Sequence, residues 1–196
     1  MALRTVTPPS GGLIALDQAK AQCRVDHDDD DDLIAALILA ATDLIERETQ
    51  RKYLAQTLEW VTETWCERMC LPVAPGGDSS KAAIASVKYA DLTSTQQTLD
   101  PSLYWDRPVG RTRALIRRWY AVWPLLGDAA ERVVIRFNIT STIDDVPPGI
   151  VHACKMLVSH FYENRDAVVG VENRDSSTEI PFGVERFLSP ERWEVL

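Results

Sequence analysis

The spacing of the apolar residues changes near residue 57, and this change limits the folds open to the chain. Between residues 33 and 45 apolar side chains recur three and four positions apart, which is typical of an amphipathic α-helix. From Thr57 to Trp65 the residues instead alternate, as expected of a half-buried β-strand. The chain therefore combines helical and β-structure. The helical apolar positions are Leu33, Ile34, Leu37, Ile38, Ala41, Leu44 and Ile45.

The spacing of apolar residues and the turn-forming residues predict elements along the rest of the sequence. Helices are predicted at about 16–24, 30–50 and 148–164, the last beginning with Pro148, whose missing N–H costs nothing in a first helical turn. A β-rich insertion is predicted at about 57–140, within which residues 113–123 suit either a helix or a strand. The predicted fold class is α+β, mainly an α-helical bundle with a β-rich insertion and an extended C-terminal segment.

The length of 196 residues indicates one principal domain. Residues 1–15 contain two prolines and a Gly-Gly pair, which predicts a flexible N-terminal arm. The domain itself is predicted at residues 16–170. Residues 171–196 form a separate tail with too few apolar positions to fold alone.

The net charge and the apolar content of the sequence exclude some classes of function. The formal charge is −8 and the pI about 4.9, whereas a protein that grips nucleic acid by its phosphates needs a basic face. The acidic balance argues against a DNA-binding regulator but is compatible with a channel through which DNA slides. No apolar run approaches the roughly 20 residues of a membrane span, and the N-terminus lacks the apolar core of a signal peptide. We expect a protein that is made and assembled in a cytoplasm, with no membrane partner.

Two features could hold a metal ion, and neither matches a ligand pattern. Cys66 and Cys70 share one face of a strand-like segment, but no second Cys or His pair completes a tetrahedral zinc site. Reduced, buried cysteines are expected instead. The acidic run 26–32 has Asp31 and Leu37 where a calcium loop needs glycine and glutamate. Carboxylates at a helix N-terminus, near the positive end of its dipole, explain the run better, so no metal site is predicted.

Catalytic machinery is not visible in the sequence. The three histidines accompany no nucleophile motif such as Gly-x-Ser-x-Gly, and no glycine-rich phosphate loop is present. We predict no catalytic residue, no cofactor-binding residue and no cofactor, and a protein that is not an enzyme. The enzymatic alternative is a metal-dependent nuclease using the aspartate run, which predicts loss of activity on Asp29→Ala and Asp31→Ala.

Four stretches carry a family resemblance, and their order and spacing cover most of the chain. They are LDQAKAQCRVDHDDDDDLIAALILAATDLIERETQRKYL at 16–54, TLDPSLYWD at 98–106, VPPGIVHACKMLVSHFYENRDAV at 146–168 and IPFGVERFLSPERW at 180–193. Together they resemble the head–tail connector (adaptor) family of tailed bacteriophages. One departure is at residues 138–142, where members often have a glycine-rich turn.

The resemblance implies a structural role in the virion. Copies would form a homo-oligomeric ring, usually of twelve, beneath the portal protein. The other face would receive the next neck or tail protein, and DNA would pass through the channel without sequence-specific binding. The chain would be assembled in the host cytoplasm and located in the neck, at the head–tail interface. A tail-completion or stopper protein of the neck is the alternative.

Aromatic residues mark the predicted contacts. Core packing accounts for most of the six tryptophans, but the C-terminal segment cannot bury its own aromatics, which are enriched at interaction hot spots. Residues 171–196 are therefore the predicted portal-docking tail. Its predicted contact residues are Phe182, Phe187, Leu188 and Trp193. The predicted contacts between subunits are Leu39, which widens the apolar surface of its helix, and Trp105 in the β-rich insertion.

Overall fold

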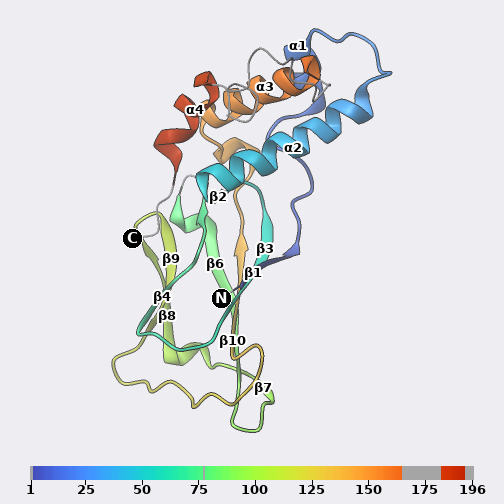
Figure 1. The fold of residues 1–196 in the computed structure, drawn as a ribbon. Helices are drawn as coiled ribbons and strands as arrows, with labels where there is room; N and C mark the ends of the chain where they lie inside the picture. Colours follow the sequence, from blue (N-terminus) through green and yellow to red (C-terminus); the bar gives the residue numbers. More distant parts are fainter. Residues whose placement is uncertain (1, 77, 165–181, 193–196) are drawn as a thin grey trace, which may run out of the picture. The chain divides into compact units, whose positions relative to one another are not determined.

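The computed structural model describes residues 2–76, 78–164 and 182–192 (Figure 1). The chain forms two compact units, each built from separated segments. Residues 1–10, 52–145 and 195–196 make up a β unit, and residues 11–51 and 146–194 make up a helical unit. The described residues contain four α-helices and ten strands, and the strands form three sheets.

The prediction of a mainly helical bundle is wrong, because helix and strand are present in roughly equal amounts. Several strands are too short to display a period of two. Strand β4, for example, has a single buried residue, Met69, between two exposed ones. The C-terminal segment, predicted as extended and, over 181–193, partly helical, is helical in its described part: Phe182–Leu188 forms α4, followed by the 3-10 turn η4 (Ser189–Glu191).

The β unit contains an antiparallel five-stranded sheet whose strand order brings the first strand to one edge. The residues predicted as a flexible arm begin with this edge strand, which pairs with β3. The order is β1 (Ala2–Thr7), β3 (Gln56–Thr62), β10 (Val133–Ile139), β6 (Ala82–Ala90) and β7 (Gln96–Thr98).

A three-stranded antiparallel sheet completes most of the β unit. Its order is β4 (Arg68–Cys70), β9 (Thr112–Arg117) and β8 (Tyr104–Val109). The ambiguous stretch 113–123 therefore begins as a strand. A tight turn joins β8 to β9 through Gly110, whose φ of 58° favours glycine. The short strands β2 (Arg51–Lys52) and β5 (Ala74–Pro75) pair separately, with the Gly76 amide donating to the Lys52 carbonyl.

The two larger sheets share one apolar core. Strands β3 and β10 contribute alternate residues, so that Leu58 lies opposite Phe137 and Trp60 opposite Ile135. Met69 and Leu115 enter the same core from the three-stranded sheet. Its remaining members are Leu71, Val73, Ala82, Val87, Leu99, Tyr104, Val133 and Ile139. The 3-10 turns η1 (Ser79–Lys81) and η2 (Pro101–Leu103) lie between strands, and η3 (Ile143–Asp145) lies between β10 and α3.

The helical unit contains α1 (Leu16–Cys23), α2 (Asp31–Thr49), α3 (Pro148–Glu163) and α4. The first three begin and end within one residue of the predicted bounds. Both α1 and α2 end at a left-handed residue, Arg24 and Gln50, the usual geometry of a helix C-terminus. Gly12 lies so close to α2 that a Cβ there would meet Ile38 Cγ2 at 2.3 Å. The buried stripes of α2 and α3 include Ile34, Ile38, Ala41, Ile45, Ile150, Ala153, Cys154, Leu157 and Val158.

Candidate interaction surfaces

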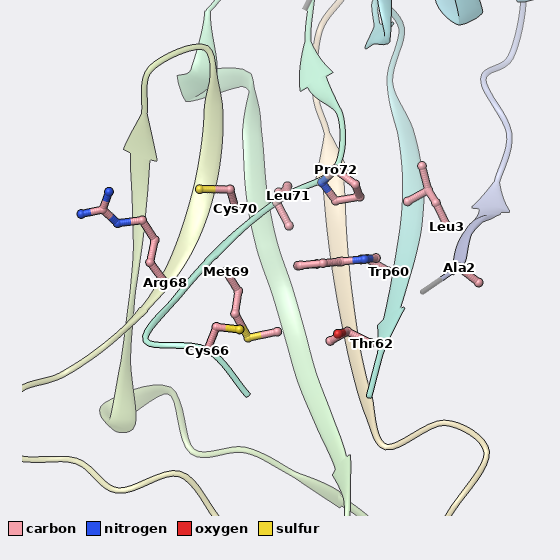
Figure 2. A pocket seen from close by; sticks show the side chains of 10 residues that line it. All are labelled: Ala2, Leu3, Trp60, Thr62, Cys66, Arg68, Met69, Cys70, Leu71 and Pro72. Atoms are coloured by element: carbon pink, nitrogen blue, oxygen red, sulfur yellow. The ribbon is translucent and has the colours of Figure 1, made fainter. Parts of the chain in front are cut away.

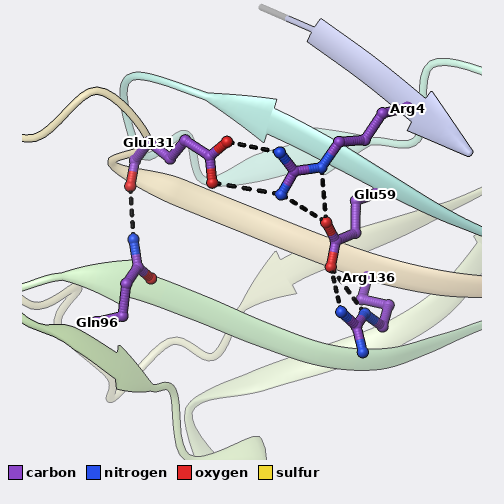
Figure 3. A network of polar contacts seen from close by, with 5 residues as sticks. All are labelled: Arg4, Glu59, Gln96, Glu131 and Arg136. Atoms are coloured by element: carbon purple, nitrogen blue, oxygen red, sulfur yellow. Dashed lines mark hydrogen bonds and ion pairs between the residues drawn. The ribbon is translucent and has the colours of Figure 1, made fainter. Parts of the chain in front are cut away.

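A row of charged side chains crosses three strands on the outer face of the five-stranded sheet (Figure 3). The register places Arg4 of β1 and Arg136 of β10 on either side of Glu59 in β3. Arg4 Nε and Arg136 Nε each donate to the Glu59 carboxylate at 2.8 Å. Burial alone would raise the pKa of Glu59, but the hydrogen bonds from Arg136 and Arg4 outweigh it and lower the pKa. Arg4 also pairs with Glu131, which holds the edge strand in place.

The connection between β9 and β10 contains the three most exposed large apolar side chains of the described residues. We call residues 118–132 the exposed loop. Trp119 is 84% exposed, Val122 80% and Leu125 73%, and exposed apolar groups gathered in this way mark interaction sites. The sequence predicts most tryptophans in the core and does not predict this surface. The signal was the stretch Trp-Tyr-Ala-Val-Trp-Pro-Leu-Leu, which is apolar but has neither helical nor strand periodicity.

The exposed loop is held at fixed points. Trp123 stacks on Trp65 with ring centroids 4.6 Å apart. Each indole N–H donates to the backbone on the other side, Trp65 to the Pro124 carbonyl and Trp123 to the Cys66 carbonyl, both at 3.0 Å. Near the start of the loop, the Tyr120 hydroxyl donates to the Ser102 carbonyl at 3.1 Å. The apolar side chains between these anchors are therefore presented on an ordered backbone.

Trp105, a predicted subunit contact, lies half-buried on the outer face of β8. The guanidinium groups of Arg107 and Arg118 lie 4.3 Å and 5.4 Å from its ring centroid. Such cation–π contacts fix the indole and leave a mixed cationic and aromatic surface. The structure places Trp105 in the same unit as the exposed loop and links the two through Arg118.

An apolar pocket of about 480 Å³ opens between the edges of the two larger sheets (Figure 2). Ala2 and Leu3 line it from β1, and Trp60 lines it from β3. Strand β4 and its flanking residues, among them Met69, supply the opposite wall. The other lining residues are Thr62, Cys66, Arg68, Cys70, Leu71 and Pro72.

Leu39, the other predicted subunit contact, is 54% exposed on α2. Ala35, Ala36 and Ala40 are exposed beside it, and the exposed ion pair between Asp43 and Arg47 continues the same side of the helix. The opposite side of α2 is the buried stripe already described. Leu39 and its alanine neighbours are exposed, and the role of Leu39 as a subunit contact stays a prediction.

The predicted portal-docking residues differ in their surroundings. Leu188 is fully buried in the helical unit, while Phe187 is partly exposed and meets His152 edge-on at 5.2 Å between ring centroids. Phe182 begins α4, but its side chain lies outside the described set, as does the whole of Trp193. Glu191 of η4 pairs with the buried Arg51 at 2.7 Å. The described part of the tail is therefore packed within its own unit.

The aspartate run leads into α2, as predicted. Three of its carboxylates accept hydrogen bonds from side chains. Lys20 donates to Asp28 and to Asp31, both at 2.7 Å, and the Tyr162 hydroxyl donates to Asp30. Asp28 and Asp29 remain almost fully exposed. No group of three or more His, Cys, Asp or Glu side chains suited to a metal ion occurs in residues 2–76, 78–164 and 182–192.

The cysteines are not uniformly buried, so that prediction is wrong for Cys66 and Cys70. Both are exposed: Cys70 ends β4, an edge strand, at an exposed position next to the buried Met69, and Cys66 precedes that strand. Cys154 is fully buried in α3, and burial raises the pKa of its thiol to about 12. Among the described helices, none is long and apolar enough to cross a membrane.

One family model matches part of the chain. Residues 13–89, which include α1, α2 and β6, match the family described as "Phage gp6-like head-tail connector protein". The predicted resemblance to head–tail connectors is confirmed. The matched family is a structural connector, not an enzyme. No curated protein sequence matches the chain significantly.

Solved structures extend the likeness to the fold of the whole chain. One chain from the virion of a native gene transfer agent particle is 20% identical with a TM-score of 0.76. A chain from the neck of an empty particle, solved with C6 symmetry, is 20% identical with a TM-score of 0.74. A chain from the neck of a native particle, solved with C12 symmetry, is 21% identical with a TM-score of 0.70. Each comparison covers 100% of this chain and 98% of the other.

Proposed function

We propose that this protein is a structural head–tail connector in the neck of a tailed phage or a related particle. Copies form a ring under the portal that joins the DNA-filled head to the tail. The observation that carries the proposal is the likeness in fold, over the full length, to chains from particle necks. The connector family match over residues 13–89 supports the same role.

The surface of the chain fits a component of an assembly. The exposed loop and the exposed face of α2 present apolar side chains on ordered backbone, and monomeric proteins rarely leave large groups of this kind uncovered. We assign both to contacts between neighbouring copies, with Leu39 on one and Trp105 beside the other. Twelve copies would match the C12 symmetry reported for one similar neck.

The acidic residues are concentrated in the helical unit. This distribution would suit a channel through which DNA passes. The helical unit contains 18 Asp and Glu against 9 Lys and Arg, whereas the β unit contains 11 against 12. An acidic wall repels phosphate and keeps contact with moving DNA weak. We propose that DNA passes through the ring without sequence-specific binding.

The C-terminal residues are proposed to dock on the portal, and a downstream neck or tail protein is proposed to bind the opposite face of the ring. Phe187, partly exposed on α4, is the described residue best placed for docking. Leu188 supports that helix from inside the helical unit. The roles of Phe182 and Trp193 are proposed from the sequence.

The test is to produce particles in the absence of this chain. We expect DNA-filled heads and free tails that do not join, and joining is restored when the chain is supplied from a plasmid. Electron microscopy of the unjoined heads separates the alternatives. Heads without a ring under the portal support the connector, heads that keep such a ring indicate a tail-completion protein, and normal joined particles contradict both.

A further inference from the structure

Trp119 is an exposed apolar side chain that is suited to burial against a partner. Its indole is 84% exposed, yet its backbone is fixed by neighbours on both sides. The Arg118 amide donates to the Leu103 carbonyl at 3.1 Å, and Tyr120 is tied to Ser102. The Tyr120 ring meets the indole edge-on at 5.5 Å between centroids. Little conformational freedom is lost when a side chain presented in this way is buried by a partner.

Trp119 follows β9, the central strand of the three-stranded sheet, by two residues, and the residues on either side of it bond to the β8 side of that sheet. Ser102 and Leu103 belong to η2, which leads directly into β8, and β8 is an edge strand. The apolar pocket lies at the other edge of that sheet, since β4 lines it, and it is closed by β1, an edge strand of the larger sheet. A projecting group and a hollow at different places on one subunit can join copies head to tail. Contacts of this kind generate rings when the rotation closes.

We propose that Trp119 of one copy inserts into the pocket between β1, β3 and β4 of the next copy. This contact rests on the proposed ring and names its subunit anchor. The pocket volume, about 480 Å³, lies within the range of roughly 300–1,000 Å³ that accepts drug-sized ligands, so an indole fits.

The lining of the pocket suits an aromatic occupant. Trp60 offers a second aromatic ring, Met69 offers a sulfur for aromatic contact, and Arg68 offers a guanidinium for a cation–π contact. A tryptophan buries roughly 150–250 Å², which is part of the roughly 800 Å² per partner of a standard interface. Trp119 is thus an anchor, with Val122 and Leu125 available to extend the contact.

Two cysteines already present in the chain allow a direct test. Cys66 and Cys70 line the pocket and are exposed, so a Trp119→Cys subunit placed beside a wild-type subunit would bring two thiols together. Rings are assembled on the portal of the same virus from a small fraction of Trp119→Cys subunits and an excess of wild type, and then treated with a short bis-maleimide. We expect a covalent dimer of the two subunits. The dimer disappears when the excess subunits carry Cys66→Ser and Cys70→Ser.

Leu92→Cys is the matched control, because Leu92 is 69% exposed in the same unit, next to β6. It should give no dimer with the pocket cysteines. A second measurement uses Trp119→Ala, which should raise the protein concentration for half-maximal ring assembly at least about tenfold, while Leu92→Ala leaves it unchanged.

The results also separate this contact from the proposed function. Rings that assemble normally with Trp119→Ala and give no dimer to the pocket overturn the contact but leave the connector role intact. A cross-link from position 119 to the portal in place of the pocket also overturns it. Failure of wild-type protein to form any ring on the portal overturns the proposed function and this contact together.

Discussion

At the scale of single residues, Glu59 shows what the alternating pattern of a strand predicts and what it does not. The sequence places Glu59 on the opposite face of its strand from Leu58 and Trp60, and the structure agrees. The sequence does not reveal that two arginine side chains cover Glu59 on this face. Arg4 and Arg136 come from positions 55 residues before and 77 residues after it, and only the strand register brings them together. Contacts at such sequence separations leave no local signal.

Glu59→Gln should destabilise the β unit. The substitution removes the charge that accepts from two guanidinium groups and leaves both without their buried partner. Because both arginines are partly exposed, we expect a loss of about 1–3 kcal/mol in the free energy of unfolding. Urea titration followed by tryptophan fluorescence measures it. Glu63→Gln, at an exposed position just after the same strand, should stay within about 0.5 kcal/mol of wild type, and an equal loss in both variants would contradict this account.

The pH dependence of stability follows from carboxylates whose pKa is lowered. Hydrogen bonds from Thr93 and Gln97 lower the pKa of Asp91 to about 2, and Lys81 and Thr142 lower that of Asp145 to about 2. Since the folded pKa lies below the ordinary value of 3.8, these groups stabilise the fold fully above that value. We expect stability to fall as the pH drops from about 4 to about 2. Denaturation at a series of pH values tests this, and a profile that rises toward pH 2 would contradict it.

At the scale of elements, long periodic segments were predictable and short or aperiodic ones were not. The 19-residue helix α2 repeats its apolar pattern over several turns, so its bounds could be read closely. Strand β4 has three residues, too few to show a period. The exposed loop is apolar without any period, and its role depends on the Trp65–Trp123 stack, which joins distant segments. Of the candidate surfaces, the sequence therefore indicated Leu39 and Trp105 but neither Trp119 nor the pocket.

The short helix α4 is held by burial. Leu188 and Val184 are fully buried, so Leu188→Ala should cost about 2–4 kcal/mol of stability in the helical unit. Arg186→Ala, at an exposed position of the same helix, should change it by less than about 0.5 kcal/mol. Thermal unfolding followed by circular dichroism compares the two. A Leu188→Ala protein as stable as wild type would mean that α4 does not pack as the structure has it.

At the scale of the whole molecule, the fold, the exposed surface and the charge distribution all fit a component of an assembly. The fold is that of chains in particle necks, the exposed apolar residues lie on ordered segments, and most of the acidic excess lies in one unit. Each of these properties fits the proposed role, in which the subunit packs sideways against its own copies and DNA passes through the ring. None of them requires a reaction centre.

The central claim is tested most directly by electron microscopy of the purified protein mixed with the portal of the same virus. We predict a ring of this chain stacked coaxially on the portal, with rotational symmetry that gives the number of copies in the same images. The ring should be absent when either component is imaged with an unrelated partner. Folded protein and intact portal that remain separate at high concentration would contradict the connector assignment.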